Sequence, residues 1–137
     1  MEDIGLLIIR IVAGLFYAAH GSQKAFGWFG GAGPKGTGEF FESVGIRPGS
    51  AMALLAGLGE FIGGLLFTFG LFIPLAALLI IIPMIVAIIT VHGKNGWFVD
   101  RGGIEYNLVL IAIAIGITFT GPGVWSLDEA YGIQIFG

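Results

Sequence analysis

Eight of the polar side chains within or beside the apolar stretches of this chain have types and spacing that could do chemistry. Such groups donate or accept hydrogen bonds, and the glutamates and histidines among them can also take up and release protons. In chain order they are Arg10, Tyr17, His20, Lys24, Glu60, His92, Glu105 and Asn107. Whether they act together depends on the elements that hold them.

The composition indicates that lipid surrounds most of the chain. Hydrophobic residues make up 56% of the 137 residues and charged residues only 11%, whereas a soluble domain carries roughly 25% charged residues. The length predicts one membrane domain over residues 1–137. The chain has a net charge of −3 and no long run of basic residues, so nucleic acid is not an expected partner. A cleaved signal peptide carries positively charged residues before its apolar segment, whereas this chain has Glu2 and Asp3 there. The first apolar stretch is therefore expected to stay in the mature protein as a helix.

Four apolar segments are long enough to cross a bilayer, given roughly 17–25 residues per helical span. They must be helices, because open strands would leave backbone groups unpaired in hydrocarbon. The predicted fold class is therefore all-α, a polytopic membrane four-helix bundle. The first loop adds a short interfacial helix that begins at the N-cap Thr37 and ends at Gly45. The predicted spans are 4–20, 50–71, 73–92 and 104–120.

Glycine and proline mark where the second and third spans meet. Gly70 is expected to end the second span and Pro74 to begin the third, so these two helices form an antiparallel hairpin. Pro83 lies inside the third span. Because proline has no N–H, the carbonyl of Leu79 is left without its helical donor.

The basic residues predict how the chain crosses the membrane. Four spans place both termini on one side and the first and third loops on the other. Every Lys and Arg outside the spans lies on the loop side: Lys24, Lys35, Arg47, Lys94 and Arg101. The positive-inside rule then places these loops in the cytoplasm and both termini outside.

Arg10 and Glu60 are expected to form an ion pair inside the bundle. At about 1.5 Å per residue, Arg10 lies about 9 Å and Glu60 about 16 Å from the outer boundary, on neighbouring antiparallel helices. Either charge alone would cost roughly 2.5–3.5 kcal/mol at a helix centre, so pairing, with help from Tyr17, would offset that cost. A purely structural role for the pair is an equally open alternative.

The other polar residues are expected to form a layer nearer the cytoplasmic side. Because intramembrane ionisable groups face the bundle interior or a wet cavity, this layer predicts a polar pocket that opens to the cytoplasm above Arg10 and Glu60. The simpler alternatives are that Glu105 favours the first turn of its helix, that the histidines sit idle at helix ends, and that Lys24 extends its charge to the interface. The layer comprises His20, Lys24, His92, Glu105 and Asn107.

Six stretches of the sequence have a distinctive order and spacing. They are "RIVAGLFYAAHGSQKAFG", "ESVGI", "GEFIGGLLFTFGLFIPLAA", "PMIVAIITVH", "GGIEYN" and "GPGVWSLD". Together they resemble the DoxX family of small four-helix membrane proteins over nearly the full length. The resemblance implies a multi-pass protein of the bacterial or archaeal cytoplasmic (inner) membrane. It also implies a link to quinone chemistry, because the family is named for a small subunit linked to a terminal quinol oxidase, and its members often stand beside soluble redox partners.

These observations predict a redox-associated, quinone-linked accessory subunit with a cytoplasm-facing pocket. His20, Lys24 or Arg10 would donate hydrogen bonds to the quinone oxygens, and Glu60 or Glu105 would accept or relay protons. The chain has no cysteine and no dinucleotide-binding glycine fingerprint, so no intrinsic cofactor is expected beyond a bound quinone. Electrons would come from a redox protein partner, and the chain would belong to an oxidoreductase system without a redox centre of its own.

Other functions stay open at this point. The same pocket would serve a non-redox module that binds or transports a small aromatic molecule, and the Gly- and Ala-rich faces would serve a structural subunit of a larger membrane complex or a homo-oligomer. A metal site is not assigned, because the His and Glu side chains spread over more than one helix turn and no ligand motif groups them. No residue is assigned a catalytic role.

Overall fold

The computed structural model describes residues 2–98, 103–123, 126–130 and 132, and these ranges contain helices and no strand. The all-α prediction is confirmed. The α-helices are α1 (Glu2–Ala25), α2 (Gly33–Ser43), α3 (Gly49–Phe69), α4 (Ile73–Ala87), α5 (Glu105–Thr120) and α6 (Leu127–Ala130). Two single 3-10 turns, η1 (Trp28–Gly30) and η3 (Gly93–Asn95), and a π-helical turn, η2 (Ile88–His92), complete the described elements.

Three stretches of helix are long and apolar enough to cross a membrane. They are α1, α3, and the continuous helical stretch Ile73–Asn95 that α4 begins. The fourth apolar helix, α5, has 16 residues, which is about 24 Å at the usual helical rise. Three helices therefore match the membrane spans that the composition predicts, and α5 is shorter than these three.

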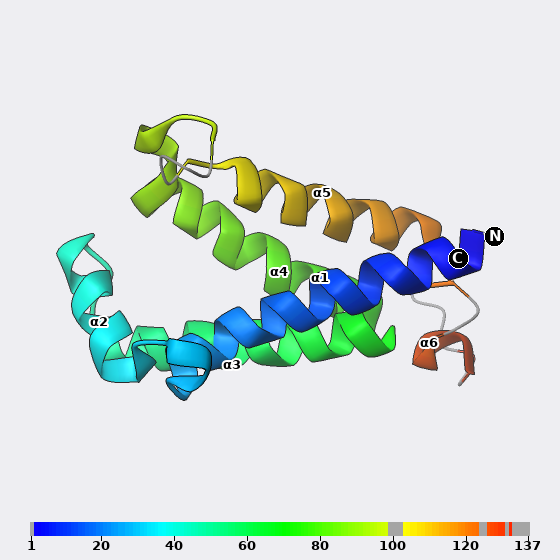
Figure 1. Cartoon of the computed structure of the whole chain (residues 1–137), viewed down its shortest axis with the longest axis horizontal. Helices are drawn as coiled ribbons and strands as arrows, with labels where there is room; N and C mark the ends of the chain where they lie inside the picture. The colour runs from blue at the N-terminus through cyan, green and yellow to red at the C-terminus, as the bar shows by residue number, and fades with distance from the viewer. Residues whose placement is uncertain (1, 99–102, 124–125, 131, 133–137) are drawn as a thin grey trace.

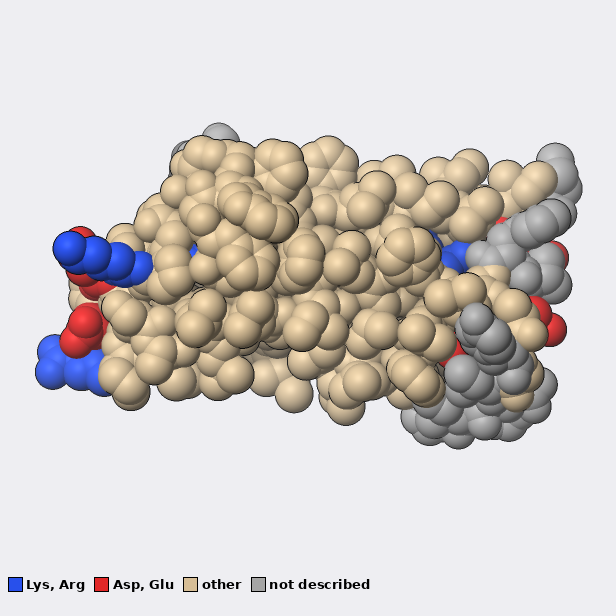
Figure 2. Space-filling view, turned by 90° about the horizontal axis from the view of Figure 1, so that it is seen from below, with Lys and Arg blue, Asp and Glu red and all other residues tan. Residues whose placement is uncertain are grey.

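The outer surface is that of a protein surrounded by lipid. Large apolar side chains stand exposed along the helices, for example Phe16 (67%), Ile82 (56%) and Phe119 (87%). Figure 2 shows that the charged side chains on this face gather at the two ends of the molecule and leave an uncharged middle. Apolar surface this extensive is avoided by soluble monomers and suits hydrocarbon.

The four long helices lie side by side, and neighbours in the chain are mostly neighbours in space (Figure 1). Helix α1 packs along α3, α3 also packs against α4, and α4 packs against α5, whereas α1 and α5 touch only slightly. Helix α2 covers α3 at the end of the molecule away from the start of α1, and α6 lies at the opposite end. One end of the bundle is therefore covered by α2, and α6 lies at the other.

Glycines bring the backbones of α1 and α3 into direct contact. A Cβ atom on Gly14 would lie 2.7 Å from the carbonyl oxygen of Gly64, and one on Gly21 would lie 2.6 Å from that of Gly57. Neither position has room for a side chain, and small residues of this kind are what allow membrane helices to approach closely. This contact fixes which polar residues of α1 stand beside which residues of α3.

The hairpin between α3 and α4 forms as predicted. Gly70 ends α3 with a φ of 66°, a conformation that glycine adopts without strain, and its N–H donates to the carbonyl of Phe67 at 3.1 Å. Pro74 stands in the first turn of α4.

The first loop contains the predicted short helix, with one boundary displaced. Helix α2 begins at Gly33 rather than at Thr37, so the prediction that Thr37 is the N-cap is wrong. Pro34 explains the earlier start, because its fixed φ suits the first turn of a helix. The helix ends at Ser43, and Gly45, with a φ of 91°, follows as the predicted stop.

Arg10 does not pair with Glu60, and this prediction is wrong. The Arg10 side chain is fully buried, and its Nη1 donates to the carbonyl oxygen of Thr68 at 3.0 Å. Thr68 lies two helical turns further along α3 than Glu60, about 12 Å at the usual rise. The glycine contact between α1 and α3 sets this register, since Gly14, one turn after Arg10, also meets Thr68.

Asp128 of α6 fastens that end of the molecule. Its side chain is buried, and its two carboxylate oxygens accept from the backbone N–H groups of Phe72 at 2.7 Å and Ile73 at 3.1 Å. Its own N–H donates to the carbonyl of Gly70 at 2.9 Å. A carboxylate at a helix N-terminus is favourable, and this one is also an electrostatic partner of Arg10. Helix α6 is thereby held against the α3–α4 hairpin.

The Asp128→Ala variant is expected to lose about 2 kcal/mol or more of stability. Two backbone donors at the start of α4 would lose their acceptor, and Arg10 would lose a neighbouring negative charge. Denaturant or thermal unfolding in detergent micelles measures the change. Glu129→Ala is the control, because Glu129 is exposed on the same short helix. Equal stability of the two variants would contradict the capping role.

Candidate functional site

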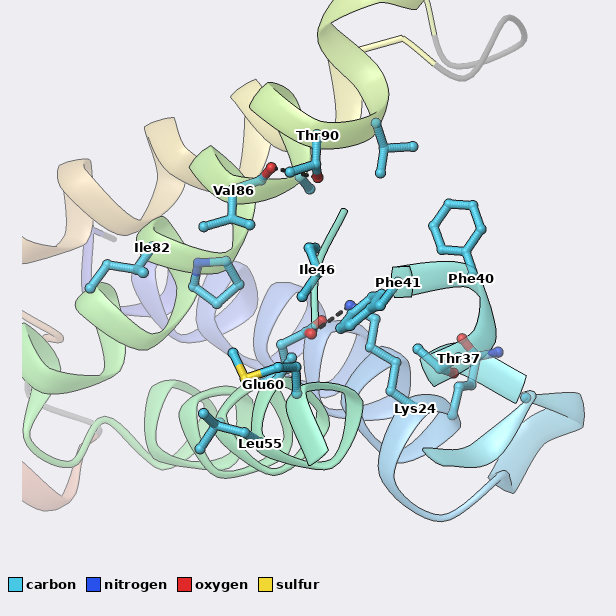
Figure 3. Close-up of a pocket in the computed structure, with 18 of the residues that line it drawn as sticks. Lys24, Thr37, Phe40, Phe41, Ile46, Leu55, Glu60, Ile82, Val86 and Thr90 are labelled. Carbon is cyan, nitrogen blue, oxygen red and sulfur yellow. Dashed lines mark hydrogen bonds and ion pairs between the residues drawn. The ribbon is translucent and has the colours of Figure 1, made fainter. Parts of the chain in front are cut away.

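A cavity of about 940 Å³ lies among α2, α3 and α4 at the end of the molecule that α2 covers (Figure 3). Its volume is near the upper end of the usual range for small-molecule sites. Most of its wall is apolar. Aromatic side chains come from α2, and aliphatic side chains come from α3 and α4, among them Phe40, Phe41, Leu55, Leu78, Ile82 and Val86.

The charged centre of the cavity is an ion pair between Lys24 of α1 and Glu60 of α3. Lys24 Nζ lies 2.5 Å from Glu60 Oε2, and Figure 3 shows the two side chains pointing toward each other. The Glu60 side chain is 1% exposed and that of Lys24 is 30% exposed. Either charge alone would be costly at this position. The pair can form because Gly21 packs directly on the backbone of Gly57 and Glu60.

Three of the eight predicted polar residues line this cavity, namely Lys24, Glu60 and His92. His92 ends the π-helical turn η2 at the loop end of the cavity. The other five predicted residues lie elsewhere, and Arg10 has been placed at the opposite end beside Thr68. The polar groups therefore do not form the single cluster that the sequence predicted.

Tyr17 supports the cavity wall from behind. It is fully buried, and its hydroxyl donates to the carbonyl oxygen of Leu79 at 2.9 Å. Pro83 lies four residues after Leu79 and supplies no N–H, so Tyr17 provides the donor that the helix lacks. Leu79 and Pro83 both line the cavity. The sequence predicts that Pro83 leaves the Leu79 carbonyl without its helical donor, and the hydrogen bond that this carbonyl accepts from Tyr17 is consistent with that prediction.

The remaining three predicted residues lie near the start of α5. His20 is exposed, and its ring lies against that of Tyr106, with the centroids 5.3 Å apart. Glu105 is exposed in the first turn of α5, which is the simpler role foreseen for it. Asn107 is buried, and its Nδ2 donates to Met84 Sδ at 3.4 Å, so it joins α5 to α4.

Sequence reasoning missed the part that α2 plays in the cavity. It treated the first loop as an interfacial covering, whereas Thr37, Phe40 and Phe41 line the cavity in Figure 3. Their spacing at i, i+3 and i+4 puts these three on one face of a helix, and that is the signal that could have indicated a face turned toward a cavity. Gln23 of α1 and Thr90 of η2 add polar groups to the lining.

No group of three or more His, Asp or Glu side chains within the described ranges is placed to hold a metal ion. The polar lining instead offers one ammonium, one carboxylate, an imidazole, an amide and hydroxyls. Such a set can hydrogen-bond the oxygens of a largely apolar molecule, and its carboxylate and imidazole can exchange protons with that molecule.

Comparison with known proteins finds a family model that matches most of the chain. The DoxX family model matches residues 5–93, a range that includes Lys24, Glu60 and His92. A Bacillus subtilis (strain 168) protein named "Putative oxidoreductase CatD" is 33% identical over 126 residues, which cover 92% of this chain and 86% of that protein. "Inner membrane protein YqjF" of Escherichia coli (strain K12) is 28% identical over 129 residues, which cover 94% and 93%. No solved structure matches the chain significantly.

Tyr17→Phe is expected to destabilise the protein by about 1–3 kcal/mol, because the Leu79 carbonyl would lose its donor in an apolar interior. In a Pro83→Ala background the restored backbone N–H can bond that carbonyl within the helix, so the cost of Tyr17→Phe should fall. Unfolding of the four proteins of this double-mutant cycle in detergent measures the coupling. Equal costs in the two backgrounds would show that Tyr17 does not compensate for Pro83.

Proposed function

The chain belongs to the DoxX family, and we propose that it works there as a quinone-linked, redox-associated membrane subunit. The quinone ring would lie in the cavity with its oxygens at the Lys24–Glu60 pair. The redox part of the proposal is supported by one relative, whose name includes the word oxidoreductase.

The observation that carries the proposal is an ion pair set in a largely apolar cavity that has aromatic side chains in its wall. A quinone has flat apolar faces, which suit Phe40 and Phe41, and carbonyl oxygens that accept hydrogen bonds. The Lys24 ammonium has three donors, of which Glu60 takes one, so a quinone oxygen can take another. In the quinol form, the new hydroxyl can donate to Glu60.

Reduction of a quinone to a quinol consumes two electrons and two protons. The electrons would come from a redox protein partner, and this chain would supply the proton path. Glu60 is buried beside the ring position, and Lys24 is partly exposed at the same point. His92, at the loop end of the cavity, would exchange protons with the aqueous side, a task for which imidazole is well suited near neutral pH.

In the membrane, α5 would serve as the fourth span and α2 would lie at the interface. The support is that α5 packs along α4 and that its last turn lies at the same end as the start of α1 (Figure 1). A short span is accommodated by local thinning of the bilayer at modest cost. With both termini outside, the cavity opens toward the cytoplasm. One relative is named an inner membrane protein, which supports the cytoplasmic membrane as the location.

A second candidate function is the binding or transport of an aromatic molecule without redox chemistry. It is favoured by the irregular backbone along one cavity wall, where Pro83 is followed by the π-helical turn η2. Irregular turns of this kind are frequent at functional sites and allow a helix to change shape. Uptake of a labelled aromatic compound into vesicles that lack any redox partner would favour this function.

Lys24→Met is expected to weaken binding of a short-chain quinone, and Glu60→Gln to weaken binding of the matching quinol, by about tenfold or more, because each removes a charge-assisted hydrogen bond of roughly 1.5–3 kcal/mol. Quenching of tryptophan fluorescence in protein-containing nanodiscs measures the affinity. Lys94→Met and Glu39→Gln are the matched controls, since both residues are exposed and lie outside the cavity. Absence of binding to the wild-type protein, or unchanged affinity in both cavity variants, would reject the proposed site.

The orientation can be tested separately. A reporter enzyme that is active only in the cytoplasm should be silent when it is fused to the C-terminus and active when it is inserted in the first loop, because the basic residues gather in the loops. The reverse pattern of activity would place the cavity on the outer side.

A further inference from the structure

The cavity extends well beyond the Lys24–Glu60 pair as an apolar groove between α3 and α4. On the α4 side its lining residues recur at helical spacing, from Leu75 through Leu78 and Ile82 to Val86, so they form one stripe. From Leu75 to His92 this side is about 25 Å long at the usual rise. A single aromatic ring would occupy only a fraction of that length.

The polar and apolar parts of the lining are separated along the groove. Gly63 of α3 meets Leu79 of α4, so Glu60, nearly one turn before Gly63 on the antiparallel helix, stands roughly level with Ile82. The polar side chains Thr90 and His92 lie on the loop side of that level. On the other side, the stretch from Leu75 to Ile82 offers only aliphatic side chains over about 10 Å.

The apolar part of the groove opens sideways toward lipid. The side chains along its rim are exposed, with Leu75 at 49%, Leu78 at 53% and Ile82 at 56%. At this depth the surroundings of the molecule are hydrocarbon. A molecule dissolved in the bilayer can therefore reach the ion pair between α3 and α4 without passing through water.

We propose that the ligand of this cavity is a quinone with a long isoprenoid tail. Its ring lies at the Lys24–Glu60 pair under α2, and its tail lies in the α3–α4 groove along Leu75, Leu78 and Ile82. This inference rests on the proposed quinone function and narrows it to membrane-dissolved quinones that enter sideways, to the exclusion of ring compounds that arrive from water.

Gly59 offers a direct way to block the groove. It lines the cavity, and a Cβ atom there would lie 3.9 Å from Leu79 Cδ2, so a side chain can be added without a backbone clash. Gly59→Phe would fill the space that the tail is proposed to occupy. Gly116→Phe is the matched control, because Gly116 is also helical, has nothing within 4 Å of its Cβ position and lies outside the cavity lining.

The experiment compares a long-tailed and a short-tailed quinone that share one ring, with wild-type protein and both variants in nanodiscs. Partition into the bilayer is the same for every variant, so it cancels from the ratio of the two affinities. We expect this ratio to fall about tenfold or more in Gly59→Phe and to stay at the wild-type value in Gly116→Phe. An unchanged ratio in Gly59→Phe would overturn the tail assignment and leave the proposed function standing.

A second measurement needs no variant. A quinone with a photoreactive group at the end of its tail is expected to label peptides that contain Leu75–Ile82. Labelling confined to α1 and α5, or a groove that only the acyl chains of a photoreactive phospholipid label, would overturn the inference. If the short-tailed quinone binds but the tail label maps outside the groove, only the inference fails. If neither quinone binds, the proposed function fails with it.

Discussion

The direct backbone contact between α1 and α3 is the constraint on which the rest of the structure depends. Gly14 meets Gly64 and Gly21 meets Gly57, and these contacts set the register of the two helices. That register carries Arg10 to Thr68 at one end and Lys24 to Glu60 near the other. The positions of the buried charges thus follow from the small residues between them, because a charge inside a membrane protein has to find its partner where the backbone permits.

The same requirement for a partner has different consequences at the two ends of the molecule. Arg10 is enclosed by the end of α3 and by α6, where Asp128 also caps α4, so that cluster fastens the fold. Glu60 is just as deeply buried from solvent, yet it borders a cavity of about 940 Å³. A buried charge with open space beside it can exchange its partner for a ligand, whereas an enclosed one cannot. We therefore propose a structural role for the first cluster and ligand binding for the second.

Features that depend on local sequence could be predicted, and features that depend on register could not. The end of α3 follows from Gly70 and the start of α4 from Pro74. The hydrogen bond that the Leu79 carbonyl accepts follows from Pro83. Each of these effects acts within a few residues. The Arg10–Glu60 pair was predicted because the estimated depths of the two residues differed by only about the length of one arginine side chain. It does not form because the glycine contact sets the register, and the sequence alone offered several possible glycine pairings between the two helices. The part of α2 in the cavity was missed because packing between distant segments leaves little trace in one sequence.

The identity of the partner of Glu60 matters for what the cavity can do. Arginine would hold a carboxylate through a rigid, bidentate fork, whereas lysine presents one ammonium on a flexible four-carbon stem. Lys24 is also 30% exposed, so its head can turn toward a ligand oxygen while α1 stays locked against α3 by the glycine contact. A ligand that bonds Lys24 and Glu60 together keeps both charges satisfied and avoids the penalty of breaking a buried pair. Because the register pairs Glu60 with Lys24 and not with Arg10, the ion pair in the cavity can separate to bind a ligand while the packing of α1 against α3 stays unchanged.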